Sequence, residues 1–157
     1  MKVFAVSDLH LPGRQNKPMD VFGGNWTGHI DKIKEDWKSK VGENDVVLIA
    51  GDLSWAMSME DGLSDLRTLV GLPGKKVFIK GNHDYTALRR AAPDDSFFFL
   101  QNDCVKFEDL VVCGSRGWTC PGSMDFTEAD KKIYQREGER FKLVFNSVKN
   151  VREEGDR

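Results

Sequence analysis

Short apolar runs alternate with longer amphipathic stretches through the first half of the chain. The runs at residues 3–6, 46–50 and 77–80 have the length and composition of buried strands. Between them, apolar residues recur at helical spacing over 30–41 and 59–70. This β-α-β-α-β order predicts right-handed crossovers and a parallel sheet, and therefore an α/β fold.

Each of the two predicted helices has one apolar face. The face of the first helix consists of Ile30, Ile33, Trp37 and Val41. The second helix begins after Ser58, which together with Asp61 fits a capping box. Its apolar face consists of Met59, Leu63, Leu66 and Val70. Both faces predict packing against the sheet.

The second half of the chain changes character. Three closely spaced apolar runs predict short strands at 97–100, 104–107 and 110–113. A short helix is expected over 85–92, and Thr127 and Asp130 open a long one. The apolar face of the long helix consists of Ile133, Tyr134, Phe141, Val144, Phe145, Val148 and Val151.

Polar side chains follow directly on each of the three strands predicted in the first half. They form three clusters, Asp8-Leu9-His10, Gly51-Asp52 and Gly81-Asn82-His83-Asp84. The carboxyl ends of parallel strands meet at one edge of a sheet, where open α/β sheets bind ligands. Carboxylate, amide and imidazole groups suit Mn, Fe or Zn rather than a thiolate site. The pattern therefore predicts one polar site at this edge.

Each cluster has a plainer explanation when it is taken alone. Asp8 and His10 can be capping or surface residues, although residues i and i+2 leaving a strand point the same way and can reach one ion. Asp52 can merely cap the segment that follows its strand. The third cluster is more informative, because Gly81 permits a tight turn and Asn82 offers a neutral carbonyl ligand. The coincidence of all three at strand ends favours a functional site.

The composition argues against nucleic-acid binding and against a membrane-spanning protein. The 157 residues, 39% hydrophobic and 31% charged, suit one soluble domain. A net charge of −2 provides no basic field for nucleic acid. The apolar runs, of about five residues, are far shorter than the roughly 20 that span a bilayer. We see no signal peptide, and the three cysteines lack C-x-x-C spacing, so we expect reduced thiols and a cytoplasmic protein.

At these intervals and strand ends, D-x-H, G-D and G-N-H-D resemble the calcineurin-like metallophosphoesterase superfamily over about the first 85 residues. The segments 114–118 and 120–122 resemble a bacterial group of predicted phosphohydrolases. The resemblance implies an αββα sandwich, in which two facing sheets are flanked by helices. This chain would hold the first sheet, with its parallel β-α-β-α-β core, and only part of the second.

The resemblance also implies a site for two divalent metal ions, Mn, Fe or Zn. Asp8 and His10 would hold the first ion. Asp52 would bridge both ions, since its two oxygens can serve two cations, and Asn82 would ligate the second. Members of the family carry further histidines in their second half, whereas no histidine follows His83 here. We therefore expect this chain alone to bind one metal weakly at most.

The remaining polar residues would act on the substrate. By the same resemblance, His83 would stabilise the phosphoryl transition state or protonate the leaving oxygen, and Asp84 would orient its ring. The nucleophile would be a metal-bound hydroxide, and the substrate a phosphomonoester or phosphodiester, such as a phosphorylated small molecule. Asn25, Trp26 and Arg116 could line the substrate pocket. Arg116 could clamp a phosphate bidentately, although a surface salt bridge explains this arginine equally well.

Two functions therefore stay open. One is a metal-dependent phosphohydrolase, or phosphatase, with doubtful activity in this chain alone. The other is a catalytically impaired fragment or pseudoenzyme that serves as a metal-binding, phosphate-binding or interaction module. A nuclease is less favoured because no basic stripe is visible, and His29 resembles no family ligand. We expect residues 1–157 to form a single truncated domain that self-associates, or pairs with a separate fragment, through its incomplete sheet.

Overall fold

The computed structural model describes most of the chain, in the stretches 1–12, 19–81 and 92–157. The chain divides into two compact units, Met1–Phe99 and Leu100–Arg157, which we describe separately. The short helix expected over 85–92 lies outside the described residues, apart from its last position. So do Asn82 and the two residues that follow it in the third polar cluster.

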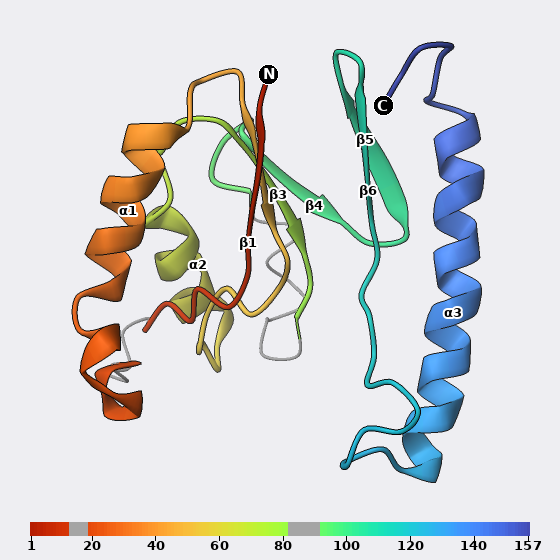
Figure 1. The fold of residues 1–157 in the computed structure, drawn as a ribbon, viewed down its shortest axis with the longest axis horizontal. Coiled ribbons are helices and arrows are strands. Elements are labelled where there is room, and N and C mark those ends of the chain that lie inside the picture. Colours follow the sequence, from red (N-terminus) through yellow and green to blue (C-terminus); the bar gives the residue numbers. More distant parts are fainter. Residues whose placement is uncertain (13–18, 82–91) are drawn as a thin grey trace. The chain divides into compact units, whose positions relative to one another are not determined.

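A four-stranded sheet with the strand order β1-β2-β3-β4 forms the centre of the first unit (Figure 1). Its strands are β1 (Val3–Val6), β2 (Val46–Ile49), β3 (Lys75–Ile79) and β4 (Phe97–Leu100). The first three strands pair in parallel, with Ala5 opposite Leu48 and Leu48 opposite Val77. The predicted parallel β-α-β-α-β core is therefore confirmed.

Helices α1 (His29–Lys40) and α2 (Met59–Arg67) lie on the same side of this sheet (Figure 1). Two successive right-handed crossovers in the same direction along a sheet place both helices on one face. Trp37 of α1 is 5% exposed, and its indole N–H donates to the Pro73 carbonyl at 2.8 Å. The segment before α1 contains two short 3-10 turns, η1 (Met19–Phe22) and η2 (Gly24–Trp26).

The end of α2 differs from the expected pattern. The Ser58 side chain accepts a hydrogen bond from the Asp61 amide, as the capping motif predicts. At the other end, Val70 is 46% exposed and Leu69 is 1% exposed, whereas helical spacing had placed Val70 on the buried face. The last turn is tightened by bonds between residues three apart, including Leu69 N–H to Leu66 O at 3.0 Å. A tighter turn brings residue i+3 onto the face that i+4 would otherwise occupy.

The second unit combines a hairpin with a long helix. Strands β5 (Asp103–Phe107) and β6 (Leu110–Gly114) pair antiparallel through a two-residue turn, and α3 covers Glu128–Lys149. Thr127 and Asp130 form a complete capping box at the start of α3. The two-stranded sheet agrees with the expected incomplete second sheet of a metallophosphoesterase-type fold.

Much of the apolar face of α3 is open. Val144 is 1% exposed, whereas Tyr134, Phe141 and Phe145 are 41%, 50% and 58% exposed. A hairpin of two strands is too narrow to cover every apolar side chain of so long a helix. Self-association through the incomplete sheet stays a prediction. Among the described helices, none combines the length and apolar character needed to cross a membrane.

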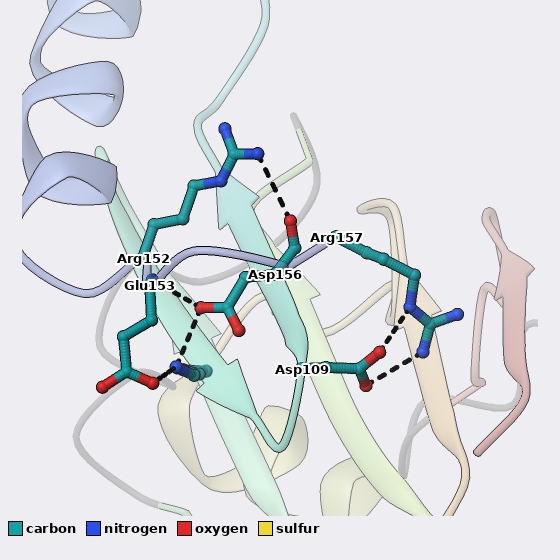
Figure 2. A network of polar contacts seen from close by, with 6 residues as sticks. Asp109, Arg152, Glu153, Asp156 and Arg157 are labelled. Atoms are coloured by element: carbon teal, nitrogen blue, oxygen red, sulfur yellow. Dashed lines mark hydrogen bonds and ion pairs between the residues drawn. The ribbon is translucent and has the colours of Figure 1, made fainter.

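The segment after α3 is tied to the hairpin by charged side chains (Figure 2). The Lys106 ammonium contacts Glu153 Oε2 at 2.5 Å and Asp156 Oδ2 at 2.8 Å. The Arg157 guanidinium donates two hydrogen bonds to Asp109, at 2.8 and 3.0 Å. The hydrogen bond from Lys106 lowers the pKa of Asp156, and the one from Arg157 lowers the pKa of Asp109.

This network predicts acid sensitivity of the second unit. Because the folded-state pKa of Asp156 is depressed, its stabilisation is present above the unfolded value of roughly 3.9 and is lost as the pH falls through the folded value. We expect Asp156→Asn to lower the thermal unfolding midpoint at pH 7 and to have little effect at pH 2. The matched control is Glu154→Gln at an exposed neighbouring position. A midpoint difference between wild type and Asp156→Asn that is the same at both pH values would contradict this account.

Candidate metal site

Two of the three predicted clusters meet at the carboxyl ends of β1 and β2. Asp8 and His10 follow β1, and Asp52 follows β2. One ligand atom from each of these three residues lies within 4.8 Å of the other two. His10 Nε2 is 3.5 Å from Asp8 Oδ1. All three residues belong to the first unit.

Backbone hydrogen bonds carry the pairing of β1 and β2 past the ends of the strands. The amides of Asp8, His10 and Leu11 donate in turn to the carbonyls of Gly51, Asp52 and Leu53, at 3.2, 3.1 and 2.8 Å. The Trp55 amide then donates to Leu11 O at 3.1 Å, and Leu11 forms a parallel bridge with Ser54. The two loops are therefore held side by side by main-chain bonds, which bring the ligand atoms together.

All three candidate ligands have a strained backbone. Five non-glycine residues among those described have a positive φ, and three of them are Asp8 (56°), His10 (46°) and Asp52 (48°). A left-handed conformation costs an L-residue about 1–2 kcal/mol, and strain of this kind persists where the surroundings enforce it. The concentration of left-handed residues at these three positions marks the ends of β1 and β2 as a candidate functional site.

Buried leucines alternate with the candidate ligands. Leu9, Leu11 and Leu53 are each no more than 3% exposed and belong to the core of the first unit. Leu9 separates Asp8 from His10, and Leu53 follows Asp52 directly. Burial of each leucine contributes about 1.5–3 kcal/mol, which is enough to offset the strain of its neighbours. The core thus anchors both loops between the polar positions.

Trp55 lies flat against the His10 ring, with the ring centroids 4.3 Å apart and the planes inclined by 14°. The Trp55 indole N–H faces Met19 Sδ at 3.3 Å. This stacking restricts rotation of the imidazole, whose Nε2 is the nitrogen near Asp8. Sequence reasoning assigned Trp55 no role, and its only signal is a position three residues after Asp52.

Two glycines allow the loops after β2 and β3 to approach each other closely. Gly51 has a φ of 91°, and a Cβ atom there would lie 2.8 Å from the Gly81 Cα. A Cβ atom on Gly81 would overlap both the carboxylate and the amide of Asp52. Gly81 opens the third predicted cluster, so the start of that cluster is packed against Asp52.

A buried polar pair holds the segment after Asp52 against α2. The Ser54 hydroxyl donates to the Asp65 carboxylate and accepts from the Ala56 amide, the latter at 2.9 Å. Ser54 is 1% exposed and Asp65 is 3% exposed. A buried, hydrogen-bonded carboxylate fixes loop geometry strongly, because losing its partner would leave an unsatisfied buried group.

The structure does not test whether the other predicted site residues reach this cluster. Asn82, His83 and Asp84 lie outside the described residues. Asn25 is exposed on η2, in the first unit. Arg116 belongs to the second unit, where its guanidinium lies 4.4 Å from the centre of the Trp118 ring. The substrate roles of Asn25 and Arg116 therefore stay predictions.

The fold and the grouped ligands can be compared with known proteins. A family model described as calcineurin-like phosphoesterase matches residues 1–154. The chain belongs to this family. This match confirms the sequence resemblance to the superfamily. Calcineurin-like phosphoesterases are generally metal-dependent phosphohydrolases.

Two proteins similar to this chain are informative. The chain is 38% identical over 84 residues to the Gene 66 protein of Mycobacterium phage D29, a match that spans 52% of this chain and 40% of the phage protein. Its fold is similar to the crystal structure of the protein of unknown function AQ665 from Aquifex aeolicus, with a TM-score of 0.51 and 18% identity over 88% of this chain and 75% of that one. The second likeness shows the fold alone.

The donor set formed by Asp8, His10 and Asp52 fits a divalent metal ion. Two carboxylates and one imidazole suit Mn, Fe or Zn. Three protein ligands are also the number typical of catalytic zinc sites, which keep a position open for water or substrate. His10 would offer Nε2, the nitrogen on the Asp8 side, as its ligand atom. The residues present therefore suit the group that the family generally binds.

The close approach of the two glycines generates a prediction for the metal site. We expect Gly81→Ala to displace Asp52, since the added methyl group has no room, and to lower Mn²⁺ affinity at least tenfold in a calorimetric titration. Overpacking of this kind costs about 1–3 kcal/mol, so the unfolding midpoint should also fall. Gly24→Ala is the matched control, because a Cβ atom there meets nothing within 4 Å. Equal affinities for the two variants would contradict the proposed packing.

The left-handed backbone generates a further prediction. Asp8→Gly and Asp8→Ala both remove the carboxylate, so both should lose metal affinity. Glycine relieves the left-handed strain at this position, whereas alanine retains it. We therefore expect the metal-free Gly variant to be more stable than the Ala variant by about 1 kcal/mol in urea unfolding. An Ala variant as stable as the Gly variant would mean that the strain at Asp8 is not real.

Proposed function

We propose that this chain is a metal-dependent phosphohydrolase and that Asp8, His10 and Asp52 hold its divalent metal ion. The observation that carries the proposal is the convergence of these three donors, within 4.8 Å, at the edge where parallel sheets bind ligands. Membership of the calcineurin-like phosphoesterase family supports the reaction class. The preferred substrate is a phosphomonoester or phosphodiester.

The exposure of the ligands supports access for a substrate. The Asp8 side chain is 56% exposed, whereas the His10 side chain is 12% exposed. His10 thus forms the inner side of the site, against Trp55, and Asp8 forms the side that solvent reaches. When bound, a divalent ion supplies positive charge that stabilises a phosphoryl oxygen and makes water more acidic.

The proposed role of Asp52 is to bridge two metal ions, since a carboxylate can offer one oxygen to each. In this proposal Asn82 would ligate the second ion, and His83 would protonate the leaving oxygen or stabilise the transition state, with Asp84 orienting its ring. The position of Gly81 against Asp52 supports this assignment, because Asn82 is the next residue along the chain.

The number of ligands sets the expected strength of the site. The first ion has three protein ligands, whereas Asp52 and Asn82 alone would serve the second. We therefore expect one ion to bind more firmly than the other, Mn²⁺ being the first to test, and hydrolysis by this chain alone to be slow. The chain spans 40% of the length of the phage protein that it matches. Any activity that needs the full length of such a protein is therefore only proposed for this chain.

A second function is favoured by the same shortage of ligands. The three histidines of the chain are His10, His29 and His83, so no later imidazole is available to complete the second metal site. A chain that holds one metal ion without turning over substrate would act as a metal-binding or phosphate-binding module.

Hydrolysis of a generic substrate separates the two functions. We expect p-nitrophenyl phosphate or its diester to be hydrolysed when Mn²⁺ is added to the purified chain, and Asp52→Asn to reduce the rate at least a hundredfold. Asp31→Asn, at an exposed position in the first turn of α1, should keep the wild-type rate.

Two results would count against the enzyme. A rate that is equal in wild type and Asp52→Asn would show that the activity does not arise at this site. A folded wild-type chain that binds Mn²⁺ but hydrolyses neither substrate would favour the module.

A further inference from the structure

His29 occupies a position beside the metal site that its place in the sequence does not reveal. It is the first residue of α1, after Gly28 in the left-handed conformation. Its Nε2 lies 3.2 Å from the Leu9 carbonyl oxygen, and its Nδ1 lies 3.2 Å from the Trp26 carbonyl oxygen. The ring also meets the Trp26 indole edge to face, with centroids 5.6 Å apart.

The contact with Leu9 falls on the peptide group that joins Leu9 to His10. The carbonyl oxygen of this peptide faces the His29 ring, and its N–H donates to the Asp52 carbonyl at 3.1 Å. A peptide group is planar, so partners at both ends fix the rotation of the whole plane. The rotation of that plane about the bond between N and Cα of His10 is the φ angle of His10, which is 46°.

We propose that His29 is a positioning residue for the metal site and that its Nε2–H donates to the Leu9 carbonyl. This hydrogen bond and the one from His10 N–H to Asp52 together clamp the peptide between Leu9 and His10. The clamp holds His10 in the left-handed conformation that aims its ring at Asp8. His29 contacts neither the metal nor the substrate, and the inference rests on the proposed metal site.

Different substitutions of His29 test its two carbonyl contacts separately. A neutral imidazole donates from one nitrogen only, so it serves either Leu9 or Trp26. The amide nitrogen of glutamine reaches about as far as Nε2, and that of asparagine about as far as Nδ1. His29→Gln should therefore keep a donor for Leu9, and His29→Asn should keep one for Trp26 alone. His29→Phe keeps an aromatic ring and loses both ring nitrogens.

The experiment is a titration of each purified, metal-free variant with Mn²⁺, in which free Mn²⁺ is measured by electron paramagnetic resonance. Loss of a residue that orients a metal ligand typically weakens affinity 10- to 100-fold. We expect His29→Phe and His29→Asn to weaken Mn²⁺ binding about tenfold, and His29→Gln to stay within about threefold of wild type. The thermal midpoint of each metal-free variant, measured in parallel, shows how much stability the substitution costs.

The outcomes separate this inference from the proposed metal site. If wild type itself binds no Mn²⁺, the metal site fails and the role of His29 fails with it. If wild type binds and all three variants bind equally well, the metal site stands and the positioning role is wrong. Equal weakening by Asn and Gln, together with equal losses of thermal midpoint, would assign His29 to the start of α1 instead. Rescue by Gln but not by Asn supports the clamp.

Discussion

The continuation of parallel pairing beyond the ends of β1 and β2 is the constraint on which the site depends. Strand pairs usually separate where their loops begin, but here three successive main-chain hydrogen bonds keep the two loops together. The chain accepts a left-handed backbone at three positions to maintain them. Two carboxylates and an imidazole are thereby brought to one point.

Several weaker features make this arrangement the stable one. The buried leucines on both loops pack into the core and thereby fix the path of the loops. The Ser54–Asp65 pair holds the second loop against α2. Gly51 and Gly81 remove the side chains that would keep β3 from approaching. These contacts fix the loops that carry the candidate ligands.

Local signals explain how much of the fold could be predicted from the sequence. The strands of the first unit, the caps at Ser58 and Thr127 and the apolar face of α1 depend on residues close together in the chain, and all were predictable. The burial of Leu69 in place of Val70 was not predictable, because it depends on how the last turn of α2 tightens.

The site was predictable in part for a related reason. Parallel strands bring their ends together, so the meeting of Asp8, His10 and Asp52 follows from the order of the elements. The stacking of Trp55 and the contact of His29 with Leu9 depend on the paths of two loops, for which the sequence has no periodic signal. The roles expected for Asn82, His83 and Asp84 rest on family resemblance and lie outside the described residues.

Anomalous diffraction at the manganese edge, from crystals of the chain grown with Mn²⁺, tests the central claim most directly. The account predicts a peak at coordination distance from Asp8, His10 and Asp52, with all three backbones still left-handed. Side chains that point apart at these positions, or a manganese peak bound elsewhere with none at this edge of the sheet, would contradict it.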